Sequence, residues 1–282
     1  MKVKGPRFDP IIEVESDNLC IPEVRQWSMD KLKYFGHYAS IFTNSMKERW
    51  DKLVYIDLFS GSGICKIKET GKTILGSPLI AMELPIKFDK YIFCEKDEER
   101  LEALKNRSRS RYNNLDISYI LGDCNENIEK IMDALPRFSK KNKILSFCFI
   151  DPFSLNIKFN TIQKMSKYLV DILLNLSEIS SIRNEHNYIK DNSSVIADLI
   201  GENNWYQNYS KSNESLSLFI FNSLNNKFNS IQYLEPENFP QIRSNVKNLP
   251  LYHLIFYSRH PLGKKFWNDI QKYSNSQPSL GF

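Results

Sequence analysis

Five short apolar runs occur at intervals between residues 53 and 177, and most of them are followed by a helix-forming stretch. Their sequences are LVYIDL (53–58), YIFCE (91–95), ISYILGD (117–123), ILSFCFID (144–151) and VDILLNLS (170–177). The fourth run is almost wholly apolar, as expected for a central parallel strand that is covered on both faces. Strands that alternate with helices predict an α/β fold with a doubly wound, mostly parallel, Rossmann-like sheet.

The rest of the chain predicts elements that surround this sheet. Apolar residues at helical spacing predict a helix over 28–50, and Ser28 and Ser77 are expected to act as helix N-caps. Runs at 241–247 and 251–258 predict an antiparallel pair that closes the sheet edge, followed by a last helix around Phe266. The expected domains are a helical N-terminal segment (1–50), a core (51–183 and 233–282) and a helical insertion (184–232).

Composition restricts the class of protein. Five cysteines form no CxxC pair, which argues against a disulfide framework, against a zinc or other metal site and for a reducing compartment. Neither a signal peptide nor a membrane-spanning run is apparent, so we expect a cytoplasmic protein with no membrane partner. The net charge of +5 and the pI of about 8.8 permit nucleic-acid binding. Two groups of basic residues are expected to lie on solvated surface: Lys105, Arg107, Arg109 and Arg111, and Lys140, Lys141 and Lys143.

The first strand runs directly into the glycine-containing turn DLFSGSG (57–63), which suits close approach of a ligand to the backbone. Asp57 at the strand end can face an ammonium group. Glu95 at the next strand end can accept hydrogen bonds from both hydroxyls of a ribose. The third glycine of the dinucleotide fingerprint is absent, which makes an NAD-linked oxidoreductase the weaker reading. The pattern favours S-adenosylmethionine as cofactor. Its expected binding residues are Asp57, Phe59, Gly61, Gly63, Glu95, Asp123 and Cys124.

Two further strand ends carry candidate groups. Asp123 could accept a hydrogen bond from an adenine amino group, with the Cys124 N–H beside it; a turn in which Asp123 caps a helix is an equally good and compatible reading. Asp151, Pro152 and Phe153 are the candidate catalytic residues, because they stand where amino-methylating enzymes carry an acidic or amide residue, two prolines and an aromatic residue. The match is partial, since this chain has one proline. In those enzymes a side-chain oxygen and a backbone carbonyl hold the target amine while the aromatic ring stacks on the base. A simple Asp-Pro turn is the competing interpretation.

Longer blocks make the chain resemble the three-Cys-motif partner (TcmP) protein family. The blocks are YIDLFSGSG (55–63), GSPLIA (76–81), FCEKD (93–97), GDCNE (122–126), FIDPF (149–153), VDILLNLS (170–177) and YHLIFYSRHPLGKKFW (252–267). The departures are Ser60 and Ser62, where an alanine and a proline are common in the family. The resemblance implies a bacterial or phage protein with a methyltransferase fold, which works beside a three-Cys-motif protein and has a role in nucleic-acid modification.

These observations lead to two hypotheses of function. The first is a methyltransferase that acts on a nucleobase or another amine, with DNA or RNA as a possible partner. The second is a catalytically inert cofactor-binding or nucleic-acid-binding subunit that serves its partner protein. A contact surface for nucleic acid or the partner is expected at Arg259, His260, Lys264 and Lys265. A helix N-terminus with solvated lysines is the alternative reading of that segment.

Overall fold

The computed structural model describes residues 17–190, 192–237, 239–244 and 250–275, and it is built around a seven-stranded sheet. In spatial order the strands are β6 (Ile117–Leu121), β5 (Lys90–Glu95), β2 (Lys52–Asp57), β7 (Ile144–Ile150), β8 (Val170–Ser177), β10 (Pro250–Tyr257) and β9 (Gln241–Arg243). The first five are parallel, whereas β10 runs antiparallel to both β8 and β9. The prediction of a mostly parallel, Rossmann-like sheet with an antiparallel C-terminal pair is therefore confirmed.

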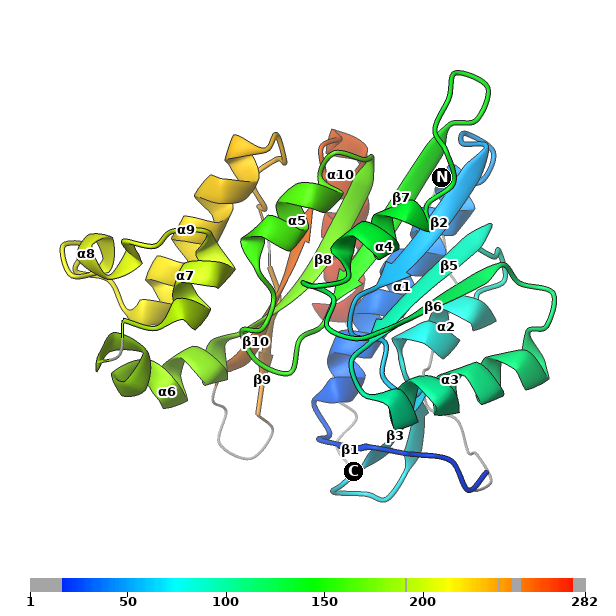
Figure 1. Cartoon of the computed structure of the whole chain (residues 1–282), viewed down its shortest axis with the longest axis horizontal. Coiled ribbons are helices and arrows are strands. Elements are labelled where there is room, and N and C mark those ends of the chain that lie inside the picture. Colours follow the sequence, from blue (N-terminus) through cyan, green and yellow to red (C-terminus); the bar gives the residue numbers. More distant parts are fainter. Residues whose placement is uncertain (1–16, 191, 238, 245–249, 276–282) are drawn as a thin grey trace.

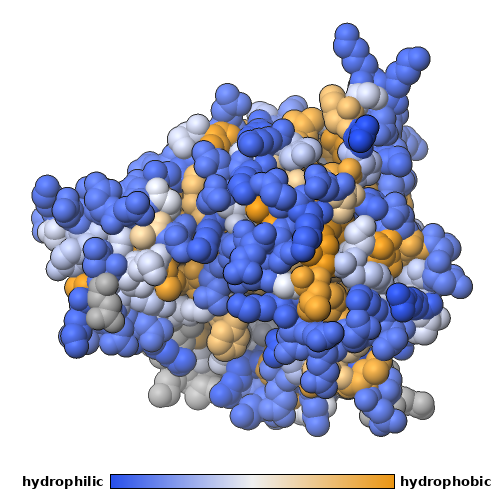
Figure 2. All heavy atoms as spheres, viewed as in Figure 1, coloured by the Kyte–Doolittle hydropathy of each residue, from blue (hydrophilic) through white to orange (hydrophobic). Residues whose placement is uncertain are grey.

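Helices cover both faces of the sheet (Figure 1). One face carries α1 (Ser28–Met46), α2 (Ser77–Glu83), α3 (Glu98–Arg111) and α10 (Pro261–Asn275). The other face carries α4 (Ile128–Asp133) and α5 (Phe159–Met165). Four more helices, α6 (Glu178–Lys190), α7 (Ser194–Ile200), α8 (Trp205–Tyr209) and α9 (Leu216–Ser230), gather at one side of the molecule. The face that bears α4 and α5 is mostly hydrophilic at its surface (Figure 2).

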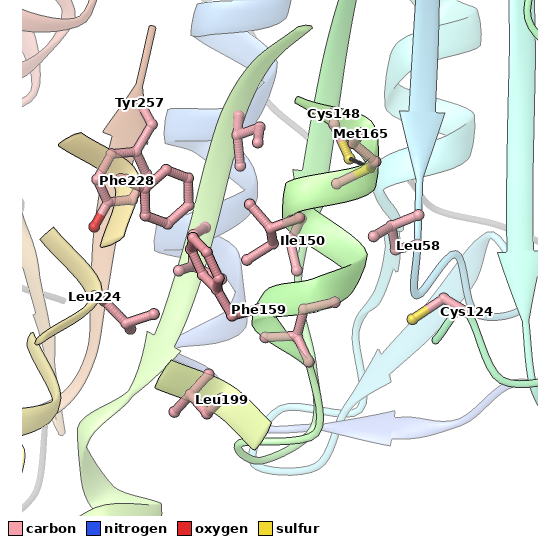
Figure 3. Packing of buried hydrophobic residues seen from close by; sticks show 14 of the residues in the cluster. Leu58, Cys124, Cys148, Ile150, Phe159, Met165, Leu199, Leu224, Phe228 and Tyr257 are labelled. Carbon is pink, nitrogen blue, oxygen red and sulfur yellow. Dashed lines mark hydrogen bonds between the residues drawn. The ribbon is translucent and has the colours of Figure 1, made fainter. Parts of the chain in front are cut away.

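Alternation along the strands separates two apolar layers. In β2, Val54 and Ile56 belong to the layer beneath α4 and α5, whereas Leu53 and Tyr55 belong to the layer beneath α1. Successive side chains of a strand point to opposite faces, so a strand that is covered twice must be apolar throughout. In the α4–α5 layer the rings of Phe228 and Tyr257 stack at 3.5 Å between centroids (Figure 3).

Several local predictions were wrong. The first helix ends at Met46, and Ser28 is its first residue, with Trp27 in the N-cap position. The cap of α2 is Gly76, so Ser77 lies inside that helix. Strand β9 is shorter than predicted, and the positions predicted as strand at 245–247 lie outside the described residues.

A small second sheet was not predicted. It pairs β1 (Glu23–Val24) with β3 (Ile64–Ile67), and β3 with β4 (Thr73–Leu75). The sequence signal for the β3–β4 hairpin is Gly71 between two short apolar runs, and Gly71 has a φ of +70°.

Arg107 also differs from expectation, because it is 4% exposed and not solvated. Its Nε lies 2.8 Å from Asp17 Oδ2, and its guanidinium donates to the Ser62 carbonyl oxygen at 2.7 Å. Arg107 therefore holds the N-terminal segment against the loop that follows β2.

Candidate functional site

The carboxyl ends of four neighbouring strands bring the predicted acidic residues to one edge of the sheet. Asp57 ends β2, Glu95 ends β5, Asp123 follows β6 and Asp151 follows β7. The chain reverses its winding direction between β2 and β7, and ligands of open α/β sheets bind at such a switch point. The fold thus places these residues around the position where a ligand is expected.

The loop after β2 is held open by Glu95. The Gly61 N–H donates to Glu95 Oε2 at 2.8 Å, and the Asp97 N–H donates to Oε1 at 3.0 Å. Gly61 has a φ of +63°, and a Cβ atom built on it would meet no atom within 4 Å. The backbone at Gly61 therefore faces open space beside a carboxylate.

Gly63 has a different role from Gly61. A Cβ atom on Gly63 would lie 2.9 Å from Leu104 Cδ1 and 3.0 Å from Leu79 Cγ. This glycine lets α2 and α3 pack closely against the loop. Phe59, which is partly buried, packs against the α4–α5 layer. Binding of a cofactor by Gly63 and Phe59 stays a prediction.

Asp57 is completely buried beneath the loop. Its carboxylate accepts hydrogen bonds from the Tyr55 hydroxyl at 2.7 Å and from the Phe59 N–H at 3.2 Å. Burial raises the pKa of Asp57 to about 7, and the nearby Asp151 charge adds to the rise, although hydrogen bonds from Ser77, Tyr55 and Phe59 oppose it. Because the exposed fraction is 0%, direct contact between this carboxylate and a ligand requires the loop to move.

Asp123 forms a turn, as one of its two predicted readings had it, but it does not cap a helix. Its Oδ1 accepts from the Asn125 N–H and from Asn125 Nδ2, both at 2.9 Å. Helix α4 begins at Ile128, five residues after Asp123, and Asn127 is in the N-cap position. Cys124 is 2% exposed and lies among the buried residues close to Leu58 (Figure 3). Burial raises the pKa of the Cys124 thiol well above its ordinary value.

Asp151 is held by two residues that the sequence analysis missed. Lys31 Nζ, from the first turn of α1, lies 2.6 Å from Oδ2 and 2.9 Å from Oδ1. Asn175 Nδ2, from β8, donates to Oδ1 at 2.7 Å. Burial lowers the pKa of Lys31, but the charge and hydrogen bond of Asp151 outweigh it, so the net pKa is raised. Lys31 is therefore protonated at neutral pH.

One acceptor beside this pair has no partner. Asn175 is completely buried, and its Oδ1 accepts no hydrogen bond from any described residue. The Lys31 ammonium also lies 5.7 Å from the centre of the Tyr252 ring. Asn175 could have been predicted as a site residue, because it is a polar residue within the apolar run VDILLNLS. Nothing comparable distinguishes Lys31 from the other polar residues of α1.

Pro152 and Phe153 differ sharply in exposure. Pro152 is buried, whereas Phe153 is 94% exposed. An aromatic ring that lies two residues after Asp151 and buries almost nothing is free to stack on a flat ligand. The geometry of the segment is therefore compatible with the predicted substrate-facing role.

The predicted basic contact surface lies at the opposite edge of the sheet. Tyr257 pairs with Ile172 near the amino end of β8, so the segment that follows it is far from Asp151. One end of the Arg259 guanidinium is occupied, since Nη2 donates to the carbonyl oxygens of Ser166 at 2.6 Å and Ile231 at 3.0 Å, whereas the buried Nε has no hydrogen-bond partner among the described residues.

The remaining residues of that basic segment lie at a helix start. Lys264 pairs with Glu237 at 2.9 Å, whereas His260 and Lys265 are exposed. Helix α10 starts at Pro261, which is the alternative reading of this segment. The structure therefore does not join the basic segment to the carboxyl-edge residues.

Within the described residues, no helix combines the length and apolar character needed to cross a bilayer. The same residues contain no group of three or more histidine, cysteine, aspartate or glutamate side chains placed to hold a metal ion.

Comparison with known proteins shows a shared fold. No protein-family model and no curated protein matches the chain. Among solved structures, protein LPL1258 of Legionella pneumophila (DUF519) is 9% identical, with a TM-score of 0.51 over 86% of this chain and 91% of that one. TYW2 of M. jannaschii in complex with AdoMet is 10% identical, with a TM-score of 0.43 over 83% and 76%. Trm1 of Pyrococcus horikoshii with S-adenosyl-L-methionine is 10% identical, with a TM-score of 0.44 over 92% and 64%. At such identities the likeness concerns the fold alone.

Proposed function

We propose that this chain is an S-adenosylmethionine-dependent methyltransferase. The observation that carries the proposal is the open space at Gly61, with the Glu95 carboxylate directly beside it at the carboxyl edge of the sheet. A carboxylate at this position can accept hydrogen bonds from two ribose hydroxyls, while the exposed backbone allows a ligand to approach. The methyltransferase-type strand order places both features at the switch point.

The residues present fit this cofactor. Glu95 and the Gly61 backbone would hold the ribose and the amino-acid end, and Asp123 with the Cys124 N–H would lie beside the adenine. Bound there, the cofactor supplies an electrophilic methyl group. The protein's share of the chemistry is to position the acceptor and to exclude water from it.

The acceptor side is formed by Asp151 and its neighbours. Asp151, which is paired with Lys31, can accept a hydrogen bond from a target amine, and as a carboxylate it can take the proton of that amine as the nitrogen is methylated. The unpartnered Asn175 Oδ1 is a second acceptor at the same place. Phe153 can stack on a planar base, a contact worth about 1–3 kcal/mol. This set favours a nucleobase amine as the acceptor.

The proposed partner is a three-Cys-motif protein. The TcmP resemblance supports a complex with a three-Cys-motif protein, and the net charge of +5 is compatible with an RNA or DNA substrate. An inert binding subunit is the competing function. Methyl transfer must therefore be assayed with and without the partner.

Cofactor binding is tested by calorimetry with S-adenosylhomocysteine, for which we expect a Kd of about 1 μM, or about −8 kcal/mol. Gly61→Val should abolish binding, because its side chain occupies the open space. Gly71→Val is the matched control, since Gly71 also has a positive φ of +70° and its nearest atom, Lys66 Cε, is 3.9 Å from a built Cβ. Gly71 lies in the β3–β4 hairpin, so its substitution imposes similar strain and should leave affinity unchanged. Equal loss in both variants would refute the placement of the site.

Turnover is tested separately with a methyl-labelled cofactor and mixed RNA or DNA. Labelled nucleic acid in the wild-type reaction supports the enzyme. Tight cofactor binding without transfer, even when a three-Cys-motif protein is added, would favour the inert subunit.

A further inference from the structure

A second cavity lies at the amino edge of the sheet. It encloses about 340 Å³ between the C-terminal half of α1, the first residues of β8 and the start of α10. Asp171 lines this cavity, six residues before Ser177 at the other end of β8. Because a strand advances about 3.3 Å per residue, the cavity is about 20 Å from the carboxyl edge. It is therefore a separate place from the proposed methyltransferase site.

The wall of the cavity is mainly apolar and aromatic. Its rings come from Tyr38, Phe42, Trp50 and Phe266. The inner end is marked by Tyr38, which is completely buried, and the rim by Leu169, which is 42% exposed. A cavity of this size and lining is suited to a small organic molecule with an apolar body.

One acidic group stands at the inner end. Asp171 Oδ2 accepts a hydrogen bond from the Tyr38 hydroxyl at 3.3 Å, and the Ser258 hydroxyl also bonds to this carboxylate. Part of the Asp171 surface stays accessible to solvent, so a molecule in the cavity can reach it. Burial raises the pKa of Asp171 to about 6, against the two hydrogen bonds, and the group is thus mostly ionised at neutral pH.

No cation neutralises this carboxylate. Across the part of the chain that the structure describes, no lysine, arginine or histidine forms an ion pair with Asp171. Arg259 lines the same cavity, but its guanidinium donates to backbone carbonyl oxygens. Arg49 and His260 are exposed, where solvent screens their charges. An ionised carboxylate in apolar surroundings without a positive partner is energetically costly.

We propose that this cavity binds a small organic amine with a flat apolar body, whose ammonium group pairs with Asp171. The ammonium would supply the missing positive charge at the inner end. The surrounding rings would hold the apolar body and attract the cation through their faces. The site does not depend on the methyltransferase assignment, because none of its residues belongs to that machinery.

Three probes of similar shape test the charge requirement by calorimetry. Phenethylamine carries an ammonium group, 2-phenylethanol is neutral and 3-phenylpropionate is an anion. We expect phenethylamine to bind at least tenfold more tightly than 2-phenylethanol, and 3-phenylpropionate to bind most weakly. Equal affinity for the amine and the alcohol, preference for the anion, or no binding of the amine at millimolar concentration would overturn the proposal.

Variants test whether phenethylamine binds in this cavity and whether the charge of Asp171 is responsible for the affinity. Asp171→Asn keeps the shape and one acceptor oxygen for the Tyr38 hydroxyl, and should lower phenethylamine affinity at least tenfold while leaving 2-phenylethanol unchanged. Phenethylamine should also change the fluorescence of Trp50, and that change should vanish in Trp50→Phe. If Asp171→Asn fails to fold, Leu262→Trp provides a second variant, which should block all probes by filling the cavity. Retention of full phenethylamine affinity in either variant would contradict the assignment.

Discussion

Replacing Asp57 by asparagine should remove a large part of the pH dependence of stability. The pKa of Asp57 is about 7 in the folded protein, against an ordinary value of 3.8. The folded state therefore binds a proton that the unfolded chain has already released. Stability from this group is complete below the unfolded pKa and is lost as the pH rises through the folded pKa. Asparagine does not titrate, so the unfolding free energy of the Asp57→Asn variant lacks this pH-dependent contribution.

The magnitude follows from the two pKa values. With about 1.4 kcal/mol for each pKa unit, the ionisation of Asp57 costs the folded state about 1.7 kcal/mol near pH 5 and about 4.3 kcal/mol near pH 8. Wild type should therefore lose about 2.5 kcal/mol relative to Asp57→Asn across this range. Asp171 and the other titrating groups are present in both proteins, so their contributions cancel in the comparison.

The assay is urea unfolding of both proteins at a series of pH values between these limits. Asp116→Asn is a control for the substitution itself, because the Asp116 side chain is 60% exposed. A difference in unfolding free energy that stays constant with pH would refute the reasoning. It would mean that Asp57 has the same proton affinity in the folded and unfolded states.

Further predictions concern single residues. Asp151→Asn should leave S-adenosylhomocysteine affinity within about twofold while lowering methyl transfer at least about a hundredfold, as measured by calorimetry and label incorporation; full activity would exclude a catalytic Asp151. Phe153→Ala should weaken nucleic-acid binding by about 1–3 kcal/mol without changing the melting temperature, because the ring buries almost nothing. Gly63→Ala should lower the unfolding free energy by about 1–3 kcal/mol through overpacking against Leu104, measured in urea. Arg107→Ala should cost about 3–5 kcal/mol, because it leaves Ser62 and Asp17 without their partner; an unchanged unfolding midpoint would contradict it.

The site was predictable where its residues belong to strand ends. Asp57, Glu95, Asp123 and Asp151 each follow an apolar run, and parallel strands bring their carboxyl ends to a common edge. The strand pattern alone was enough to predict that these four residues lie at that edge. The open space at Gly61 and the packing role of Gly63 could not be distinguished from the sequence, because both are glycines in one short turn. Their difference depends on α2 and α3, which pack against only one of them.

The sequence by itself determined the fold class and the set of polar groups at the strand ends. Apolar periodicity and turn residues are local signals, because each depends only on residues a few positions apart in the chain. Only the tertiary structure decided the surroundings of those groups. Lys31 and Asp151 are 120 residues apart and meet because α1 packs across the sheet. Arg107, which local charge had placed on the surface, is buried because the N-terminal segment at Asp17 and the loop at Ser62 close over it. The antiparallel pairing of β10 with β8 sets the basic C-terminal segment at the edge opposite to Asp151. Contacts between distant segments depend on how apolar faces are shared between elements, and no local pattern contains that information.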